Sequence, residues 1–307
     1  MKISFQTYKV QEWFGGDIMG VVELARRADE LGVHQVNMVE HILMGTDFSN
    51  YPYGDFGVGP EYPWFETISV LSAIAAVTRN IRLSTGVMIS PLRPAPLLAK
   101  QLATLDNLSR GRVDIGIGPG WQRAEYDAAS IPWERRFSRM TDQLRACKAL
   151  WTQAPASHHG EFYSFDNVYS TPFPVQPGGV PIWFGFALND RNLDRIAELG
   201  DGWLPARETP AQMAEGIRRI KDAMAAKGRD PDRLQVRAGL HGPPGRRSDL
   251  NAALDRIPEL AAAGATVVEI SPAAFCKSPE QAEDLFKAAV AAGAEADDTL
   301  TPRPSQA

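Results

Sequence analysis

One histidine stands at a position from which its side chain could do chemistry. His41 follows a short apolar segment, His34–Val39, that is typical of a buried strand. It precedes a long segment, residues 43–62, that is rich in glycine, proline and aromatic residues. A histidine there can donate a hydrogen bond to a ligand or move a proton, and Glu40 beside it is a second polar group. A histidine whose ring only bonds backbone carbonyls is the alternative interpretation.

A cluster of glycines follows another short apolar segment. Residues 112–117 predict a buried strand, and the residues that come directly after it are Gly118, Pro119, Gly120 and Trp121. Glycine lets the backbone turn sharply and approach a flat ligand closely. Trp121 stands where a dinucleotide-binding turn requires its third glycine, so that motif is absent. The cluster therefore favours a surface for a flat ring, with a tight turn and no ligand as the alternative.

Two later segments carry groups that suit an anion. Leu188 and Asn189 precede a helix that is predicted to begin near Asp190, and the backbone N–H groups of a first helical turn can hold a phosphate. Asn189 is also a good N-cap residue, which explains it without a ligand. Arg207 follows the next predicted strand and can supply positive charge, with a solvated arginine as the alternative.

The remaining polar motifs carry less information about function. His34 begins its strand at the opposite end from His41, and we assign it no role. His158 and His159 lie in an irregular segment, 153–180, with at most one hairpin, and we expect both to be solvated. The first predicted strand is followed by Gln6-Thr7-Tyr8 rather than by histidines, so we expect no metal site.

The elements that must position these residues alternate regularly along the chain. The predicted strands are Lys2–Gln6, His34–Val39, Ile81–Val87, 112–117, Pro181–Phe186, Gly202–Pro205, Leu234–Leu240 and Thr266–Ser271. The predicted helices are Ile18–Leu31, Pro63–Val77, 96–109, 134–151, 190–199, 210–227, 249–263 and 279–292. This alternation favours an α/β fold, an eight-stranded parallel (β/α)8 TIM barrel with insertion loops. The segments that follow the strands of such a barrel meet at one end, so the polar residues above should come together there.

Composition restricts the class of protein and the partners that we expect. The chain has 307 residues, of which 44% are hydrophobic and 22% charged, as in globular proteins with a large core. The net charge of −5 gives no support for a nucleic-acid partner, and no apolar run predicts a membrane partner. Two distant cysteines, Cys147 and Cys276, and the absence of a signal-peptide pattern favour a cytoplasmic protein. We expect one barrel domain over residues 1–295 and a flexible tail over 296–307.

Several segments together carry a family resemblance, in family order over about residues 1–230. They are Glu40-His41, residues 73–121, the run from RAEY to LW at 123–151, GEFYSF at 160–165, PVQPGGVPIW at 174–183 and AELGDGW at 197–203. With them the chain resembles the luciferase-like monooxygenase superfamily, especially its coenzyme F420-dependent oxidoreductases. The resemblance implies the same eight-fold barrel, with a flavin or deazaflavin bound at its mouth.

The resemblance also implies roles for individual residues. His41 matches the histidine beside the ring that assists hydride or proton transfer, and Glu40 is its neighbour in the same motif. Gly86 and Val87 match a bulge after the third strand that presses against the back of the ring, often with a non-proline cis peptide.

Two loops match parts of the cofactor site. Gly118 to Trp121 match the loop that lines the ring, and Leu188-Asn189 match the loop that holds the phosphate, to which we add Arg207. The stretch Phe186–Asn189 departs from the Gly-Gly-Asn-Ser type sequence that relatives usually carry there. Trp121 replaces the acidic glutamate of the sugar-phosphate dehydrogenases of the family, which argues against that substrate class.

Three functions stay open at this point. The first, which we favour, is an oxidoreductase that uses coenzyme F420 for hydride transfer with a small organic substrate. The second is an FMN-dependent monooxygenase that takes reduced flavin from a partner reductase. The third is a non-catalytic flavin-binding barrel, which His41 disfavours. The substrate should lie in an apolar pocket under residues 43–62, and family analogy suggests a homodimer.

Overall fold

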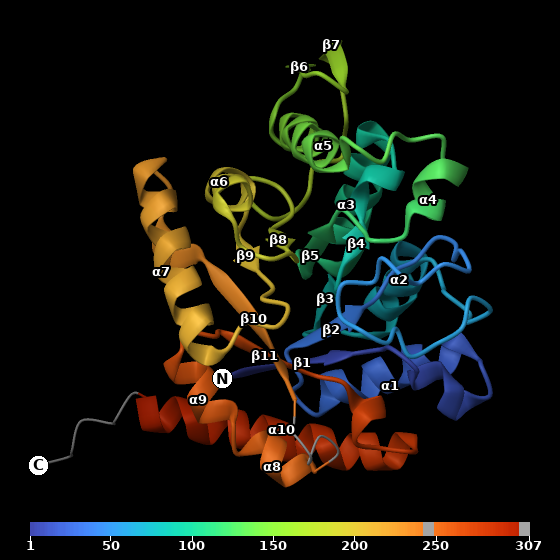
Figure 1. The fold of residues 1–307 in the computed structure, drawn as a ribbon, viewed down its shortest axis with the longest axis vertical. Coiled ribbons are helices and arrows are strands. Elements are labelled where there is room, and N and C mark those ends of the chain that lie inside the picture. The colour runs from blue at the N-terminus through green and yellow to red at the C-terminus, as the bar shows by residue number, and fades with distance from the viewer. Residues whose placement is uncertain (242–248, 301–307) are drawn as a thin grey trace, which may run out of the picture.

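The computed structural model describes residues 1–241 and 249–300 (Figure 1). Within these ranges eight parallel strands close into a barrel. They are β1 (Lys2–Gln6), β2 (Gln35–Met38), β3 (Arg82–Thr85), β5 (Val113–Gly118), β8 (Ile182–Phe184), β9 (Gly202–Trp203), β10 (Gln235–Leu240) and β11 (Val267–Ile270). Strand β11 returns to β1, with Lys2 opposite Val267, and β3 pairs with β5. The predicted α/β barrel is confirmed.

Helices cover the outside of the barrel (Figure 1). They are α1 (Ile18–Glu30), α2 (Thr67–Val77), α3 (Ala95–Ser109), α5 (Arg136–Thr152), α6 (Asp190–Leu199), α7 (Pro210–Ala226), α8 (Leu250–Leu254), α9 (Ile257–Ala262) and α10 (Pro279–Leu300). Short 3-10 helices lie at Val10–Phe14, Ser90–Leu92, Pro231–Arg233 and Pro272–Ala274. In the described part of the chain, no helix is both long and apolar enough to cross a membrane.

Two elements near the barrel's carboxyl end were not predicted, and both bear on the site. Helix α4 (Arg123–Ala128) directly follows the glycine cluster, in a segment expected to be a loop. Strand β4 (Met88–Ile89) pairs with β5 beyond the point where β3 ends, Met88 opposite Ile117. The third predicted strand, Ile81–Val87, is therefore interrupted at Gly86-Val87, where the chain bulges before it pairs again.

Three predicted helices needed correction. The helix expected from Pro63 begins only at Thr67, because the Glu66 carboxylate accepts the Ser69 N–H over 2.7 Å and caps the first turn. The helix expected over 249–263 is divided into α8 and α9. Pro258 lies at the break, and its ring removes a backbone donor and crowds the carbonyl four residues earlier.

The third correction concerns the end of the chain. The helix expected over 279–292 continues to Leu300, so residues 296–300, which we expected in a flexible tail, are helical. Residues 301–307 lie outside the described ranges. The single hairpin expected within 153–180 is present as antiparallel β6 (Ala156–His159) and β7 (Ser164–Val168), which project beyond α5 (Figure 1).

A buried polar layer fills the barrel beneath its carboxyl end. The Arg237 guanidinium donates to Gln35 Oε1 over 2.8 Å and to Ser84 Oγ over 2.9 Å, and its Nε lies 3.1 Å from Glu269 Oε2. These contacts join β10, β2, β3 and β11 across the interior. The barrel is thus closed from below, and any ligand must enter from the end where the strands finish.

Candidate active site at the barrel mouth

His41 lies just past the carboxyl end of β2 and is 7% exposed. Its Nδ1 lies 3.1 Å from Oε2 of Glu125, whose side chain is fully buried. Oε1 of the same carboxylate accepts the N–H of Ile42 over 2.8 Å. Glu125 is a residue that sequence reasoning missed. The sequence offered one signal, an acidic residue shortly after the Gly118–Trp121 cluster. That signal becomes informative only when it is known that helix α4 brings the residue back to His41.

Aromatic side chains surround the His41 ring. Edge-on contacts join it to Trp64, Phe56 and Trp121, with ring centroids 4.8, 5.5 and 5.6 Å away. Phe56 belongs to residues 42–62, here called the lid, which also bring Tyr51 to 5.1 Å from Trp121. These rings leave 7% of His41 exposed, and Phe56 is the ring that the lid contributes.

The bulge between β3 and β4 fits into a notch made by two glycines. The Gly86–Val87 peptide bond is cis, as the resemblance led us to expect. A Cβ on Gly118 would lie 2.7 Å from Val87 Cγ2, and one on Gly185 would lie 2.3 Å from Val87 Cγ1. Real side chains do not approach that closely, so both positions are restricted to glycine by Val87 itself. The glycine at 118 thus has a packing role whether or not a ring lies nearby.

Gly86 and Gly120 must be glycine for different, local reasons. A Cβ on Gly86 would lie 2.2 Å from Asn37 Nδ2, inside the barrel. Gly120 has a φ of +71°, a conformation that L side chains rarely adopt, and it turns the chain from Pro119 into Trp121. The tight turn that the cluster predicted is present, but it leads into helix α4 rather than into the expected loop.

Both carboxylate oxygens of Glu40 accept hydrogen bonds from other groups of the protein. Its carboxylate accepts the Ile89 N–H over 2.8 Å, the Thr67 hydroxyl over 2.6 Å, and two bonds from the Arg93 guanidinium at 3.0 and 2.7 Å. These contacts tie the end of β2 to α2 and to the segment after β4. They give Glu40 a structural task beside the mouth, and its role as a cofactor-binding residue stays a prediction.

The predicted anion-binding residues line a separate groove of about 660 Å³ between the loop before α6, the loop after β9 and helix α7. Leu188 and Arg207 both line it. Asn189 acts as the N-cap of α6, its side chain accepting the Asn192 N–H over 3.0 Å, so the simpler interpretation of that residue holds. Arg207 donates to the carbonyl oxygen of Tyr53 in the lid and stacks on its ring at 5.1 Å.

The lid connects the groove with the histidine. Tyr53 contacts Tyr51 at 5.5 Å, and Tyr51 in turn contacts Trp121 beside His41. Burial raises the pKa of both tyrosine hydroxyls, so they stay neutral phenols. The structure therefore brings His41, Trp121, Val87 and Arg207 to one end of the barrel, as predicted.

Comparison with known proteins gives the family. The family model described as luciferase-like monooxygenase matches residues 6–306. The chain belongs to this family. Members of it are oxidoreductases and monooxygenases, and the family binds flavin-type cofactors.

Three similar proteins illustrate its range. Rv0953c of Mycobacterium tuberculosis is 40% identical over 169 residues, which are 55% of this chain and 57% of that protein. The FMNH(2)-dependent dimethylsulfone monooxygenase of Pseudomonas putida is 31% identical over 53% of this chain and 44% of its own. The chain thus matches about half the length of these relatives. The solved F420-dependent secondary alcohol dehydrogenase shares the fold, with a TM-score of 0.74, 14% identity, and coverage of 95% of this chain and 98% of that one.

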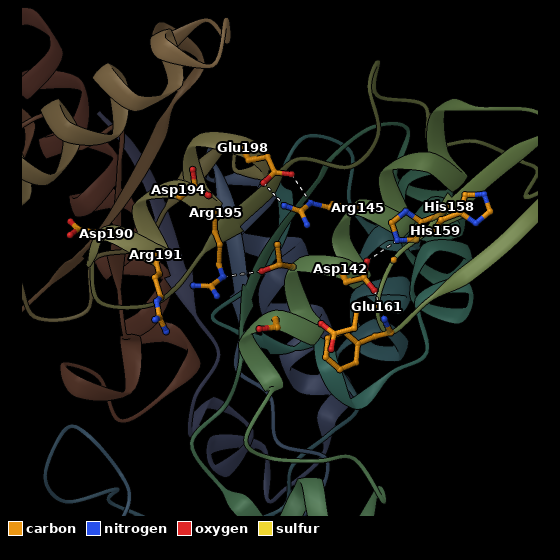
Figure 2. A pocket seen from close by; sticks show the side chains of 14 residues that line it. Asp142, Arg145, His158, His159, Glu161, Asp190, Arg191, Asp194, Arg195 and Glu198 are labelled. Atoms are coloured by element: carbon orange, nitrogen blue, oxygen red, sulfur yellow. Dashed lines mark hydrogen bonds and ion pairs between the residues drawn. The ribbon is translucent and has the colours of Figure 1, made fainter.

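A second cavity lies away from the mouth, between α5, α6 and the β6–β7 hairpin (Figure 2). It has a volume of about 690 Å³ and a charged lining. His158 lies there with Nε2 2.8 Å from Oδ1 of the buried Asp142, so our expectation that it is solvated was wrong. His159 is mostly exposed, 3.1 Å from Asp166.

Proposed function

We propose that this protein is an oxidoreductase that uses coenzyme F420 for hydride transfer to or from a small organic substrate. The observation that carries the proposal is the position of His41. A buried histidine, held by a carboxylate, stands at the mouth of a barrel whose family binds flavin-type cofactors, and we propose that the cofactor binds at this end. A non-catalytic flavin-binding barrel would have no need of it.

The described residues fit the proposed cofactor in two respects. The groove beside Leu188 is lined by Arg207 and Arg219 together with Glu208 and Glu215, and it lies next to the first turn of α6. We propose that Arg207 and the N–H groups of that turn receive the anionic end of such a molecule. The cis bulge at Gly86-Val87 lies at the carboxyl end of β3, where we propose that it backs the ring. When bound, the ring would supply the two-electron chemistry.

Side chains of the protein would exclude water, bind the substrate and move the proton. Trp64, Trp121 and Phe56 would exclude water from the reacting atoms and form an apolar pocket for the substrate. His41 would donate a hydrogen bond or exchange a proton with the substrate. Arg207 would hold the anionic end of the cofactor. We keep Glu40 as a proposed neighbour of the cofactor, acting through the backbone that it fixes.

The choice of F420 over FMN rests on the resemblance of residues 73–121 and the segments after it. The dehydrogenase that shares the fold is F420-dependent by its name, whereas the Pseudomonas relative is FMNH(2)-dependent. The second candidate is accordingly an FMN-dependent monooxygenase that receives reduced flavin from a partner reductase and uses molecular oxygen. We also propose a homodimer, which analytical ultracentrifugation would test.

Titration of the purified protein with F420 and with FMN, followed by fluorescence, separates the two candidates. We expect F420 to bind more tightly. Micromolar binding of FMN with no binding of F420 would replace the first candidate by the second. No binding of either molecule would contradict the proposed function altogether.

A further inference from the structure

Helix α4 presents one carboxylate to the histidine of the mouth. Glu125 has a fully buried side chain, and its two oxygens bind two successive residues, His41 through Nδ1 at 3.1 Å and Ile42 through its N–H at 2.8 Å. A bidentate hold of this kind sets both the place of the backbone and the rotation of the imidazole ring. It is made by the scaffold, because α4 lies outside the lid.

The position of Glu125 is itself fixed by packing. The next residue, Tyr126, is fully buried, and its hydroxyl donates to the carbonyl oxygen of Pro119 in the glycine cluster. Trp133 packs edge-on against the Tyr126 ring at 5.2 Å, and the Ile131 N–H donates to the Tyr126 carbonyl over 2.9 Å. The carboxylate is therefore positioned by contacts made within residues 119–133 in the ligand-free protein.

The contact decides where the protons of His41 lie. A carboxylate only accepts hydrogen bonds, so the Nδ1 that faces it must carry a proton. The neutral ring is then the Nδ1–H tautomer, and Nε2 keeps its lone pair for a group in the mouth. The other rings packed against His41 are uncharged aromatics, and the neighbouring carboxylate of Glu40 is paired with Arg93. Among these neighbours, Glu125 is thus the charged group that contacts the His41 ring.

We infer that Glu125 is the positioning residue of the site: it fixes the Nδ1–H tautomer of His41 and stabilises the imidazolium, so that Nε2 accepts a proton from the substrate during its oxidation and then releases it to solvent. This inference rests on the proposed function of His41. In the transfer one bond breaks at the substrate and one N–H bond forms at Nε2, while the Nδ1 proton stays between the ring and Glu125. Glu125 itself does not touch the substrate.

The test removes the charge of the Glu125 side chain and keeps its size and shape. Glu125→Gln retains an amide oxygen for the Ile42 N–H but removes the negative charge and offers Nδ1 a group that can also donate. Nitrogen-15 NMR of the histidines in the ligand-free protein reports the tautomer of His41. We expect the Nδ1–H tautomer in the unaltered protein. In the variant we expect a mixture with the Nε2–H tautomer, because the amide can also donate to Nδ1.

Two further variants complete the design. Glu125→Asp keeps a group that can only accept, and it should preserve the Nδ1–H tautomer of His41 better than Glu125→Gln does. Asp142→Asn alters the other buried histidine–carboxylate pair, far from the mouth, and should leave the His41 signals unchanged. An unchanged tautomer of His41 in Glu125→Gln would overturn the inference. The measurement needs no cofactor, so a failure of F420 and FMN to bind would be seen separately.

Discussion

His41 and His158 each place a ring nitrogen within hydrogen-bond distance of a buried carboxylate, 3.1 Å from Glu125 and 2.8 Å from Asp142. The two pairs differ in what else the carboxylate holds. Glu125 accepts one backbone N–H, from the residue next to His41. Asp142 accepts two, from Phe162 and Tyr163 at 2.7 and 3.0 Å, and so it closes the turn of the β6–β7 hairpin. One pair orients a ring, whereas the other ties a hairpin to α5.

The surroundings of the two pairs differ as well. His41 follows a strand of the parallel barrel and is enclosed by aromatic rings. His158 is part of an antiparallel hairpin outside the barrel, in a cavity whose charged groups are largely paired, such as Arg145 with Glu198 (Figure 2). A histidine–carboxylate contact therefore does not by itself mark a catalytic group. Its place at the carboxyl end of parallel strands is what makes His41 the candidate.

Removing each histidine should separate the two pairs most clearly. His41→Ala should reduce turnover by about 10²–10⁴-fold, the usual range for a positioned acid or base. His158→Ala should leave turnover within about twofold, because the hairpin does not reach the mouth. The measurement is steady-state turnover with the cofactor that binds and a substrate found by screening. His41→Gln keeps a donor without a titrating group, and it distinguishes hydrogen bonding from proton transfer. Equal activities of the alanine variants would remove the catalytic assignment.

The Asp142–His158 pair should contribute to the free energy of unfolding rather than to turnover. Asp142→Ala leaves two backbone N–H groups and His158 without their acceptor, which should cost about 3 kcal/mol of unfolding free energy. Turnover of the folded protein should change little. Urea unfolding of the variant beside the unaltered protein gives the free energy. A loss of activity without a loss of stability would mean that the hairpin takes part in the reaction.

The sequence predicted the barrel well because each strand is a short apolar segment followed by a helix. It did not predict α4, since Arg123–Ala128 is only six residues long and is charged at most positions that face solvent. With α4 missing, the partner of His41 could not be found, because 84 residues separate His41 from Glu125. Glu40 illustrates the same limit. Its neighbour His41 suggested a ligand, whereas its bonds to Arg93 and Ile89 depend on how α2 and β4 return to the end of β2.

His158 shows how a local pattern misleads. Two adjacent histidines in a polar, irregular segment look solvated, and His159 is mostly exposed. His158 points the other way because neighbours in a strand alternate sides, and its side faces Asp142 on α5. The pleat of a four-residue strand is enough to give two identical residues different surroundings.

A third histidine extends the comparison to a ring without a carboxylate. His34 precedes β2, at the opposite end from His41, and burial together with the nearby charges of Lys2 and Arg82 lowers its pKa to about 4. Because this pKa lies below that of the unfolded chain, the stabilising effect of a neutral His34 is fully present above about pH 6.5 and is lost as the pH falls toward 4. Between pH 7 and pH 5 the protein should lose about 2 kcal/mol through this group alone. His34→Gln cannot gain the proton, so urea unfolding at both pH values should show a smaller loss for the variant by about that amount. The same loss in both proteins would mean that the fold does not lower the pKa of His34, and that burial and the nearby cations do not disfavour its charged form.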